Sequence, residues 1–368
     1  MKLAKLSLAA IMAAGAFSFA SATPLTDAIK GVDLSGMVRL RFYNDNRDKS
    51  SVTPDLNRWR TSADFKFTLP VSDAFKFVYQ LSVENNMRTN GNVATTAFTS
   101  GTATENQSYI SYSSNGLNVI AGRVPVATTV TTSGHGENIG DGAIATYSMG
   151  NFTAAGAFID DINVGVVGGA DIAALAGIYN SKMFDAQAWY YRITNVAKYV
   201  YTISVNVKPM AGLKIHGDYA AGKLDIAGAD NKNYYNLSAS YAANAFSVMG
   251  GYAATNKKVG VISLNADAPI GNVIPVEQNY NIANATDTAA FYAKVGYNVN
   301  KKTNVSFRYA NINDKTVANV DSNEYDLEGS YQYNKKLRFS SYYSMLKHNS
   351  GNKSLNNNEF RFEAKYSF

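Results

Sequence analysis

The chain ends in the stretch Phe360-Arg361-Phe362-Glu363-Ala364-Lys365-Tyr366-Ser367-Phe368, in which apolar and polar side chains alternate to the last residue. Successive side chains of a β-strand point to opposite faces, so the stretch predicts an amphipathic strand with one apolar face. A strand of a soluble β-sandwich would show the same alternation. The ending alone therefore predicts a strand, and the rest of the chain must decide between the two settings.

An aromatic last strand is typical of barrels that are delivered to the outer membrane, and earlier stretches repeat its pattern. In several of them, charged side chains oppose an apolar face over the whole length of the strand, as in membrane barrels. The predicted fold is all-β: a transmembrane antiparallel β-barrel of about 18 strands, with about 16 as the alternative. The predicted strands cover about 34–43, 58–69, 75–84, 107–113, 117–124, 142–148, 152–158, 171–180, 185–193, 198–208, 213–226, 233–243, 246–255, 289–299, 304–312, 323–334, 337–346 and 358–368.

The composition agrees with such a barrel. The 368 residues include no cysteine, so disulfide and thiol chemistry are excluded, and 25 tyrosines far exceed 2 tryptophans. Tyrosine suits the interfacial girdles of a barrel. The mean hydropathy of −0.19 argues against a helical membrane protein. A formal charge of +6, spread along the chain, gives no reason to expect a nucleic-acid partner.

Residues 1–22 read as a signal peptide. Lys2 and Lys5 form its basic start, Leu6 to Ala20 is apolar, and Ala20-Ser21-Ala22 is a typical cleavage site. We expect cleavage to leave residues 23–368 as a single barrel. No later stretch is long and apolar enough to cross a bilayer as a helix, so a membrane location would require a closed barrel.

The predicted connections alternate between short turns and longer loops, as outer-membrane barrels require. Short turns such as Ser114-Asn115-Gly116 and Asn334-Lys335-Lys336 contain residues that favour turns. Longer segments, among them 86–105, 125–141 and 256–288, would lie at the opposite end and face outward. An even number of strands places both termini on the periplasmic side.

Two stretches resemble the Campylobacter major outer membrane protein family. They are Ala22-Thr23-Pro24-Leu25-Thr26-Asp27-Ala28-Ile29-Lys30-Gly31-Val32-Asp33-Leu34-Ser35-Gly36-Met37-Val38-Arg39-Leu40-Arg41, and Ser108-Tyr109-Ile110-Ser111-Tyr112 followed by Val119-Ile120-Ala121-Gly122-Arg123. The resemblance implies an 18-stranded general porin that forms homotrimers. It would lie in the outer membrane against lipid and lipopolysaccharide and pass small hydrophilic solutes and ions.

In porins the loop after the fifth strand folds into the lumen, and charges at the narrowest point select solutes. The resemblance places this loop at 125–141, with Glu137 and Asp141 as its acids. Strand parity offers a basic wall opposite it, so an acidic loop facing arginines would set up a transverse field. The predicted constriction residues are Arg39, Arg41, Arg58, Arg60, Arg123, Glu137 and Asp141.

A metal site is a further expectation. Asp141 and Asp171 match acidic positions of the family, and with Glu137 or Glu277 they could hold a calcium ion through oxygen ligands. The alternative is that these residues are ordinary loop acids. No cofactor is required for a porin.

Two other functions stay open at this point, a substrate-specific channel and a surface adhesin or antigen with exposed loops such as 256–288. Catalysis is not expected, because no serine motif accompanies the three histidines, His135, His216 and His348.

Overall fold

The computed structural model describes residues 31–47, 56–90, 102–132, 138–160, 162, 170–316, 320–350 and 353–368. The predicted signal peptide, residues 1–22, and the predicted constriction residue Glu137 lie outside these ranges. Among the described residues, no helix has the length and hydropathy needed to cross a bilayer.

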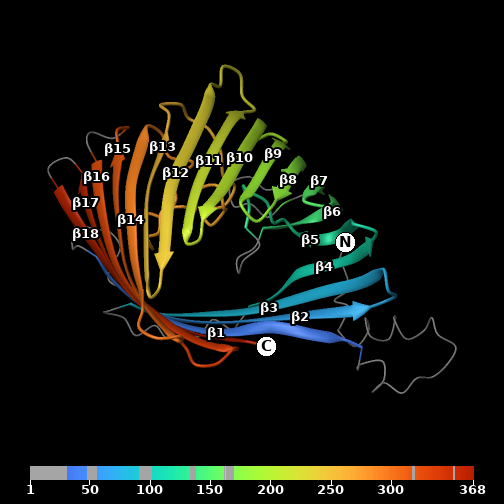
Figure 1. The fold of residues 1–368 in the computed structure, drawn as a ribbon, viewed down its shortest axis with the longest axis horizontal. Helices are drawn as coiled ribbons and strands as arrows, with labels where there is room; N and C mark the ends of the chain where they lie inside the picture. The colour runs from blue at the N-terminus through green and yellow to red at the C-terminus, as the bar shows by residue number, and fades with distance from the viewer. Residues whose placement is uncertain are drawn as a thin grey trace.

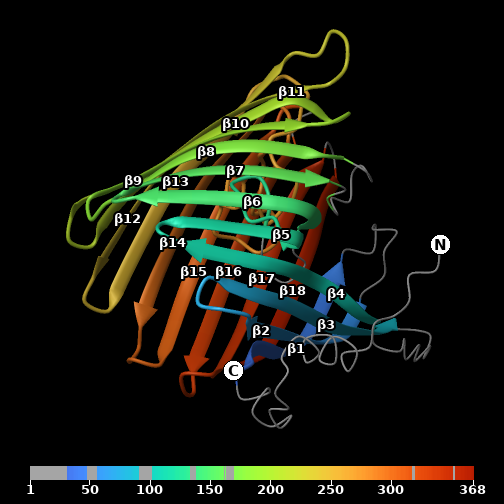
Figure 2. The same cartoon turned by 90° about the vertical axis from the view of Figure 1, so that its right-hand side faces the viewer.

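All the strands belong to one closed antiparallel barrel (Figures 1 and 2). Strand β1 pairs with both β2 and β18, and β9 pairs with β10, so the ring has no open edge. The predicted count of 18 is confirmed. The strands are β1 (Asp33–Arg47), β2 (Leu56–Pro70), β3 (Phe75–Asn90), β4 (Thr102–Ser114), β5 (Leu117–Pro125), β6 (Ile139–Met149), β7 (Phe152–Asp160), β8 (Ile172–Asn180), β9 (Phe184–Ile193), β10 (Ala197–Met210), β11 (Leu213–Leu224), β12 (Asn231–Ala243), β13 (Phe246–Thr255), β14 (Thr288–Asn298), β15 (Thr303–Asp314), β16 (Val320–Gln332), β17 (Leu337–Ser350) and β18 (Lys353–Ser367).

The carboxyl-terminal strand closes the ring, as its alternation predicts. The Gly36 N–H donates to the Phe368 carbonyl at 3.0 Å, and the Phe368 N–H donates back to the Gly36 carbonyl at 3.1 Å. On the outer face of this seam, the ring of Phe42 lies 4.8 Å from that of Trp59 and 6.5 Å from that of Phe360. The inner face carries the charged residues, since Arg41 pairs in register with Glu363.

The outer face of the barrel is apolar. Large hydrophobic side chains that a soluble protein would bury are exposed there, including Leu237 at 62 %, Phe291 at 60 % and Leu327 at 57 %. Tyrosines accompany them on many strands, which is typical of the aromatic girdles of membrane barrels. Within a strand, the residues before and after an exposed apolar side chain point to the inner face. This period of two separates the apolar outer face of the barrel from the lumen.

The β13–β14 connection, residues 256–287 (loop 256–287), corrects the prediction that segment 256–288 is displayed outward. The loop folds into the barrel. Its backbone amides at Leu264 and Ile270 donate to the carbonyls of Val130 (2.8 Å) and Thr129 (2.9 Å) in the β5–β6 connection. The prediction is wrong because the loop carries apolar side chains that need burial: Ile262, Ala268, Ile270, Ile274, Val276, Ile282 and Ala283 are all buried.

Candidate functional site

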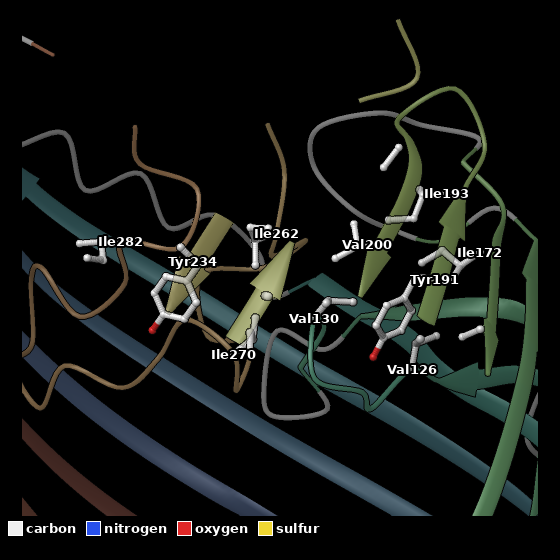
Figure 3. Close-up of a cluster of buried hydrophobic side chains, with 14 of the residues drawn as sticks. Val126, Val130, Ile172, Tyr191, Ile193, Val200, Tyr234, Ile262, Ile270 and Ile282 are labelled. Atoms are coloured by element: carbon white, nitrogen blue, oxygen red, sulfur yellow. The ribbon is translucent and has the colours of Figure 1, made fainter. Parts of the chain in front are cut away.

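An apolar cluster fills one side of the lumen (Figure 3). Val126 and Val130 of the β5–β6 connection and Ile262 and Ile270 of loop 256–287 contribute to it. The wall contributes inward-facing side chains of strands from β3 to β15, among them Val124, Ile159, Ile172, Tyr191, Ile193, Val200 and Tyr234. The two connections therefore share a dry core inside the barrel, and the passage is confined to the other side.

Hydrogen bonds fix the β5–β6 connection to the wall. The Thr129 hydroxyl lies 2.7 Å from the Tyr191 hydroxyl on β9 and 2.6 Å from the Thr202 hydroxyl on β10, and all three side chains are buried. Within loop 256–287, the Asn284 amide oxygen accepts from the backbone amides of Ile262 (2.8 Å) and Ser263 (3.0 Å) and so joins the two limbs of the loop. Specific hydrogen bonds therefore hold both connections in place inside the barrel.

The apolar cluster yields a first prediction. Ile270→Ala removes a fully buried side chain and should lower the local stability of loop 256–287 by about 2–5 kcal/mol. Hydrogen exchange of the loop amides should then speed up. The control is Ile226→Ala, which removes an isoleucine that is 60 % exposed. Equal exchange rates in the loop of both variants would contradict the packing described above.

The tip of loop 256–287 crosses the lumen and carries one acid to a basic wall. Glu277 accepts from the Arg308 guanidinium on β15 at 2.7 Å, and its second oxygen lies 3.5 Å from Nη2 of Arg361 on β18. Arg308 also pairs with Glu328 on β16, and Arg361 stacks over the ring of Tyr342 at 4.3 Å. One loop carboxylate therefore joins two wall strands.

Three consecutive backbone amides hold the same tip against β16. Glu324 accepts from the N–H groups of Glu277 at 3.0 Å, Gln278 at 2.7 Å and Asn279 at 2.9 Å, and Asp326 accepts a second bond from Glu277 N–H at 2.8 Å. Successive amides that converge on a carboxylate form an anion-binding nest. Because both carboxylates are almost fully buried, this contact fixes the position of the loop tip.

The Gln278 side chain extends the anchor to β17 and β18. Its Nε2 donates to the Ser344 hydroxyl at 2.8 Å, and its Oε1 accepts from the Asn357 side-chain amide at 2.6 Å. The tip is therefore bonded to four adjacent strands, β15 to β18.

Arginines also line the wall at β1 and β2. Arg41 pairs with Glu363, and Arg60 lies 2.6 Å from Glu84. Arg58 stacks over the Tyr43 ring at 4.1 Å. Four of the predicted constriction residues, Arg39, Arg41, Arg58 and Arg60, thus share the lumenal face, with Arg41 and Arg60 directly opposite each other in register.

A cavity of about 590 Å³ lies between the loop and this wall, bounded by loop 256–287 and by β1, β14, β15, β17 and β18. Burial and the nearby Asp267 carboxylate raise the pKa of Tyr280, so its hydroxyl stays protonated there. The charged side chains of the lining are the basic Arg39, Arg41, Lys294, Arg308 and Arg361 and the acidic Asp267, Glu277 and Glu359. This is the candidate constriction.

Arg123 and Asp141 lie elsewhere, and their predicted place in the lumen is corrected. Val124 on β5 is fully buried by the apolar cluster, so its neighbour Arg123 points to the outer face and is exposed. Asp141 stands opposite Arg123 in the β5–β6 register and is also exposed. The rule that polar residues face the lumen fails here because inserted chain covers this part of the wall with apolar side chains.

Asp171 lies just before β8 and is half-buried. Glu277, its predicted partner in a calcium site, is bonded to the arginines of the opposite wall. Within the described ranges no three Asp, Glu, His or Cys side chains form a group that could hold a metal ion.

The described histidines form no catalytic arrangement with serine and an acid. Asp218 lies between His216 (2.7 Å) and the Ser204 hydroxyl (2.6 Å), so the serine donates to the carboxylate and not to the imidazole. His348 Nδ1 lies 2.6 Å from the Ser322 hydroxyl, and no carboxylate is bonded to His348 within the part of the chain that the structure describes.

Sequence reasoning missed Lys294, which lines the cavity, and the charged residues that position the loop, Arg308, Glu324 and Asp326. Arg308 and Glu324 occupy lumen positions of strands that were predicted, so parity alone could have found them. The apolar side chains of segment 256–288 were the second usable sign, because an exposed loop has no reason to carry so many.

Comparison of the sequence with known families and proteins gives two results. Residues 1–182 match the model of the Campylobacter major outer membrane protein family. No curated protein sequence matches the chain.

Solved structures of similar fold include three proteins of Pseudomonas aeruginosa. OccK9 (OpdG) has a TM-score of 0.75 at 12% identity, covering 93% of this chain and 100% of that one. OpdK, solved with vanillate, has 0.73 at 13% identity, covering 91% and 98%. The outer membrane protein OprD has 0.69 at 15% identity, covering 91% and 93%. At these identities the likeness shows the fold alone.

Proposed function

Because this chain belongs, through residues 1–182, to the Campylobacter major outer membrane protein family, we propose that it is a general diffusion porin. It is a multi-pass β-barrel of the bacterial outer membrane. In this proposal, small hydrophilic solutes and ions cross passively through the cavity between loop 256–287 and the arginine wall. No catalytic step is involved.

The observation that carries the proposal is the position of Glu277. Its carboxylate contacts Arg308 and Arg361 from inside the lumen, so a loop narrows the barrel at a place where fixed charges of both signs face the free passage. Such a charged narrowing acts on solutes by their size and charge.

Planar-bilayer recording of the purified protein tests this function. We expect stepwise, ohmic conductance in potassium chloride, because a fixed constriction passes ions in proportion to the applied voltage. A protein that inserts into the bilayer without producing conductance steps would refute the proposal.

A substrate-specific channel is the second candidate. The observation that favours it is the extent of the inserted chain, since two connections and their apolar cluster occupy one side of the lumen and leave a small charged cavity. In that case the flux of one solute class would saturate, whereas the flux through a general porin rises in proportion to concentration.

Two finer points are proposals on family grounds. We propose that the protein forms homotrimers. Chemical cross-linking in native membranes would test this, and the expected result is a ladder of bands that ends at three copies.

We also retain calcium binding at Asp141 and Asp171 as a proposal. Recording of the channel current with and without a chelator would test it. Unchanged currents after chelation, together with no calcium bound in a dialysis assay, would remove the metal.

A further inference from the structure

Two basic side chains of the cavity lack a partner that balances their charge. Arg39 is only 7 % exposed. Its Nε donates to the Ser62 hydroxyl at 3.2 Å, while its Nη2 has no hydrogen-bond partner. Lys294 on β14 lines the same cavity, and within the described ranges it has neither an ion pair nor a hydrogen bond. A buried guanidinium nitrogen without an acceptor is costly, so this wall is short of one acceptor.

The neighbouring acids do not supply that acceptor, because they are bonded elsewhere. Glu363 pairs with Arg41, and Glu277 pairs with Arg308 and Arg361. Glu359 accepts from the Tyr342 hydroxyl. Arg39 and Lys294 are therefore the two basic side chains of the lining that have no bonded carboxylate in the described residues.

We propose that the cavity holds a binding subsite for a small oxyanion, a phosphate or a carboxylate, with Arg39 as its hydrogen-bond donor and Lys294 as a second positive charge of the same lining. The inference rests on the proposed function, because the ligand reaches the cavity through the channel. Phosphate and carboxylate each present two oxygen atoms that can accept the two parallel N–H bonds of an arginine fork. Arg39 offers directed N–H donors, and Lys294 adds a point charge on a flexible stem.

A bound anion would also supply the missing acceptor at Arg39. Arg39 and Lys294 approach the cavity from different strands, and loop 256–287 covers it with Asp267 and Tyr280. The Tyr280 hydroxyl adds a neutral donor to the lining. Solutes with an oxyanion group would therefore pause in this cavity, and chloride, which is spherical, would pass with less retention.

The test uses the full-length protein in planar bilayers at constant potassium chloride. Inorganic phosphate and acetate are added in separate titrations, and the chloride current and its fluctuations are recorded. We expect a block that saturates with concentration. Arg39→Gln and Lys294→Gln should each raise the concentration for half block about tenfold, as expected for the loss of one charge-assisted contact.

Lys66→Gln is the matched control, because it removes one positive charge from the lumenal face of β2 outside the cavity lining. It should leave the half-block concentration unchanged. Lys294→Gln keeps the test valid if the buried Arg39 variant does not fold.

The outcomes separate the subsite from the channel. Block by both anions supports the shared chemistry, and block by one alone supports the subsite and identifies its ligand. Conductance steps without saturable block, or equal loss of block in Lys66→Gln, would overturn the subsite and leave the porin function standing. An absence of conductance steps would overturn the function itself.

Discussion

Replacing Glu324 by alanine is expected to raise the single-channel conductance and the open-channel noise, because the replacement releases the tip of loop 256–287 from the wall. Glu324 accepts three backbone N–H bonds at 3.0, 2.7 and 2.9 Å. Each bond to a charged acceptor contributes about 1.5–3 kcal/mol, so on the order of 5 kcal/mol of anchoring is lost. A tip held that weakly would leave the wall often and widen the passage.

The control is Glu328→Ala, on the same face of β16. Glu328 pairs with Arg308 and accepts from the Ser306 hydroxyl at 3.2 Å, and it has no bond to the loop tip in the described residues. Its removal changes the lumen charge equally but leaves the three N–H bonds of Glu324 in place. If Glu324→Ala and Glu328→Ala gave the same conductance and noise, the Glu324 carboxylate would not be the anchor of the loop.

Gly36→Val is expected to prevent most of the protein from closing its barrel. A side chain at Gly36 would collide with the backbone carbonyl of Asp64 on β2 and would stand 3.1 Å from the Phe368 ring. The same residue exchanges two backbone hydrogen bonds with Phe368. Because the Asp64 carbonyl is backbone of the paired strand β2 and cannot move away without breaking that pairing, the seam between β18, β1 and β2 should open.

Electrophoretic mobility with and without heating measures this effect, since a closed barrel migrates differently from the unfolded chain. We expect the folded band to fall to a minor fraction in Gly36→Val. The control Ala63→Val enlarges a partly exposed side chain on β2, beside Val38 in the register. A folded fraction in Gly36→Val as high as in the control would show that close packing at Gly36 is not needed for closure.

The strands could be predicted from the sequence because their pattern is local. In β1, β2 and β18 every second side chain is apolar, and lipid on one side and water on the other impose that period directly. The terminal strand was informative for the same reason: Phe360 to Phe368 carry an outer aromatic face whose neighbours on β1 and β2 repeat the pattern. The number of strands and the position of the seam could be predicted from this alternation.

The inward path of the two connections could not be predicted, because no local sequence pattern specifies the path of a loop. Loop 256–287 contacts residues far away in sequence, such as Thr129 and Asn357. Because the loop is buried in the lumen, the inward-facing side chains of the wall beneath it are apolar instead of polar. This is why β6 and β8 show little alternation and why Arg123 was assigned to the wrong face. Arg39 and Arg41, beyond the reach of the cluster, were assigned correctly by parity.

The position of loop 256–287 in the conducting path is the central claim, and cysteine accessibility tests it most directly. The natural chain has no cysteine, so a single introduced thiol is the only target. Asn272 lines the cavity and its side chain is exposed there. Leu327, 57 % exposed on the outer face, provides the control position.

The measurement is the current through single channels while a charged, water-soluble thiol reagent is added. For Asn272→Cys we predict a stepwise fall in conductance that persists after the reagent is washed out and that a reducing agent restores, and for Leu327→Cys no change. Full conductance of Asn272→Cys after mass spectrometry has confirmed its modification would contradict the account, since the loop would then lie outside the path of the ions.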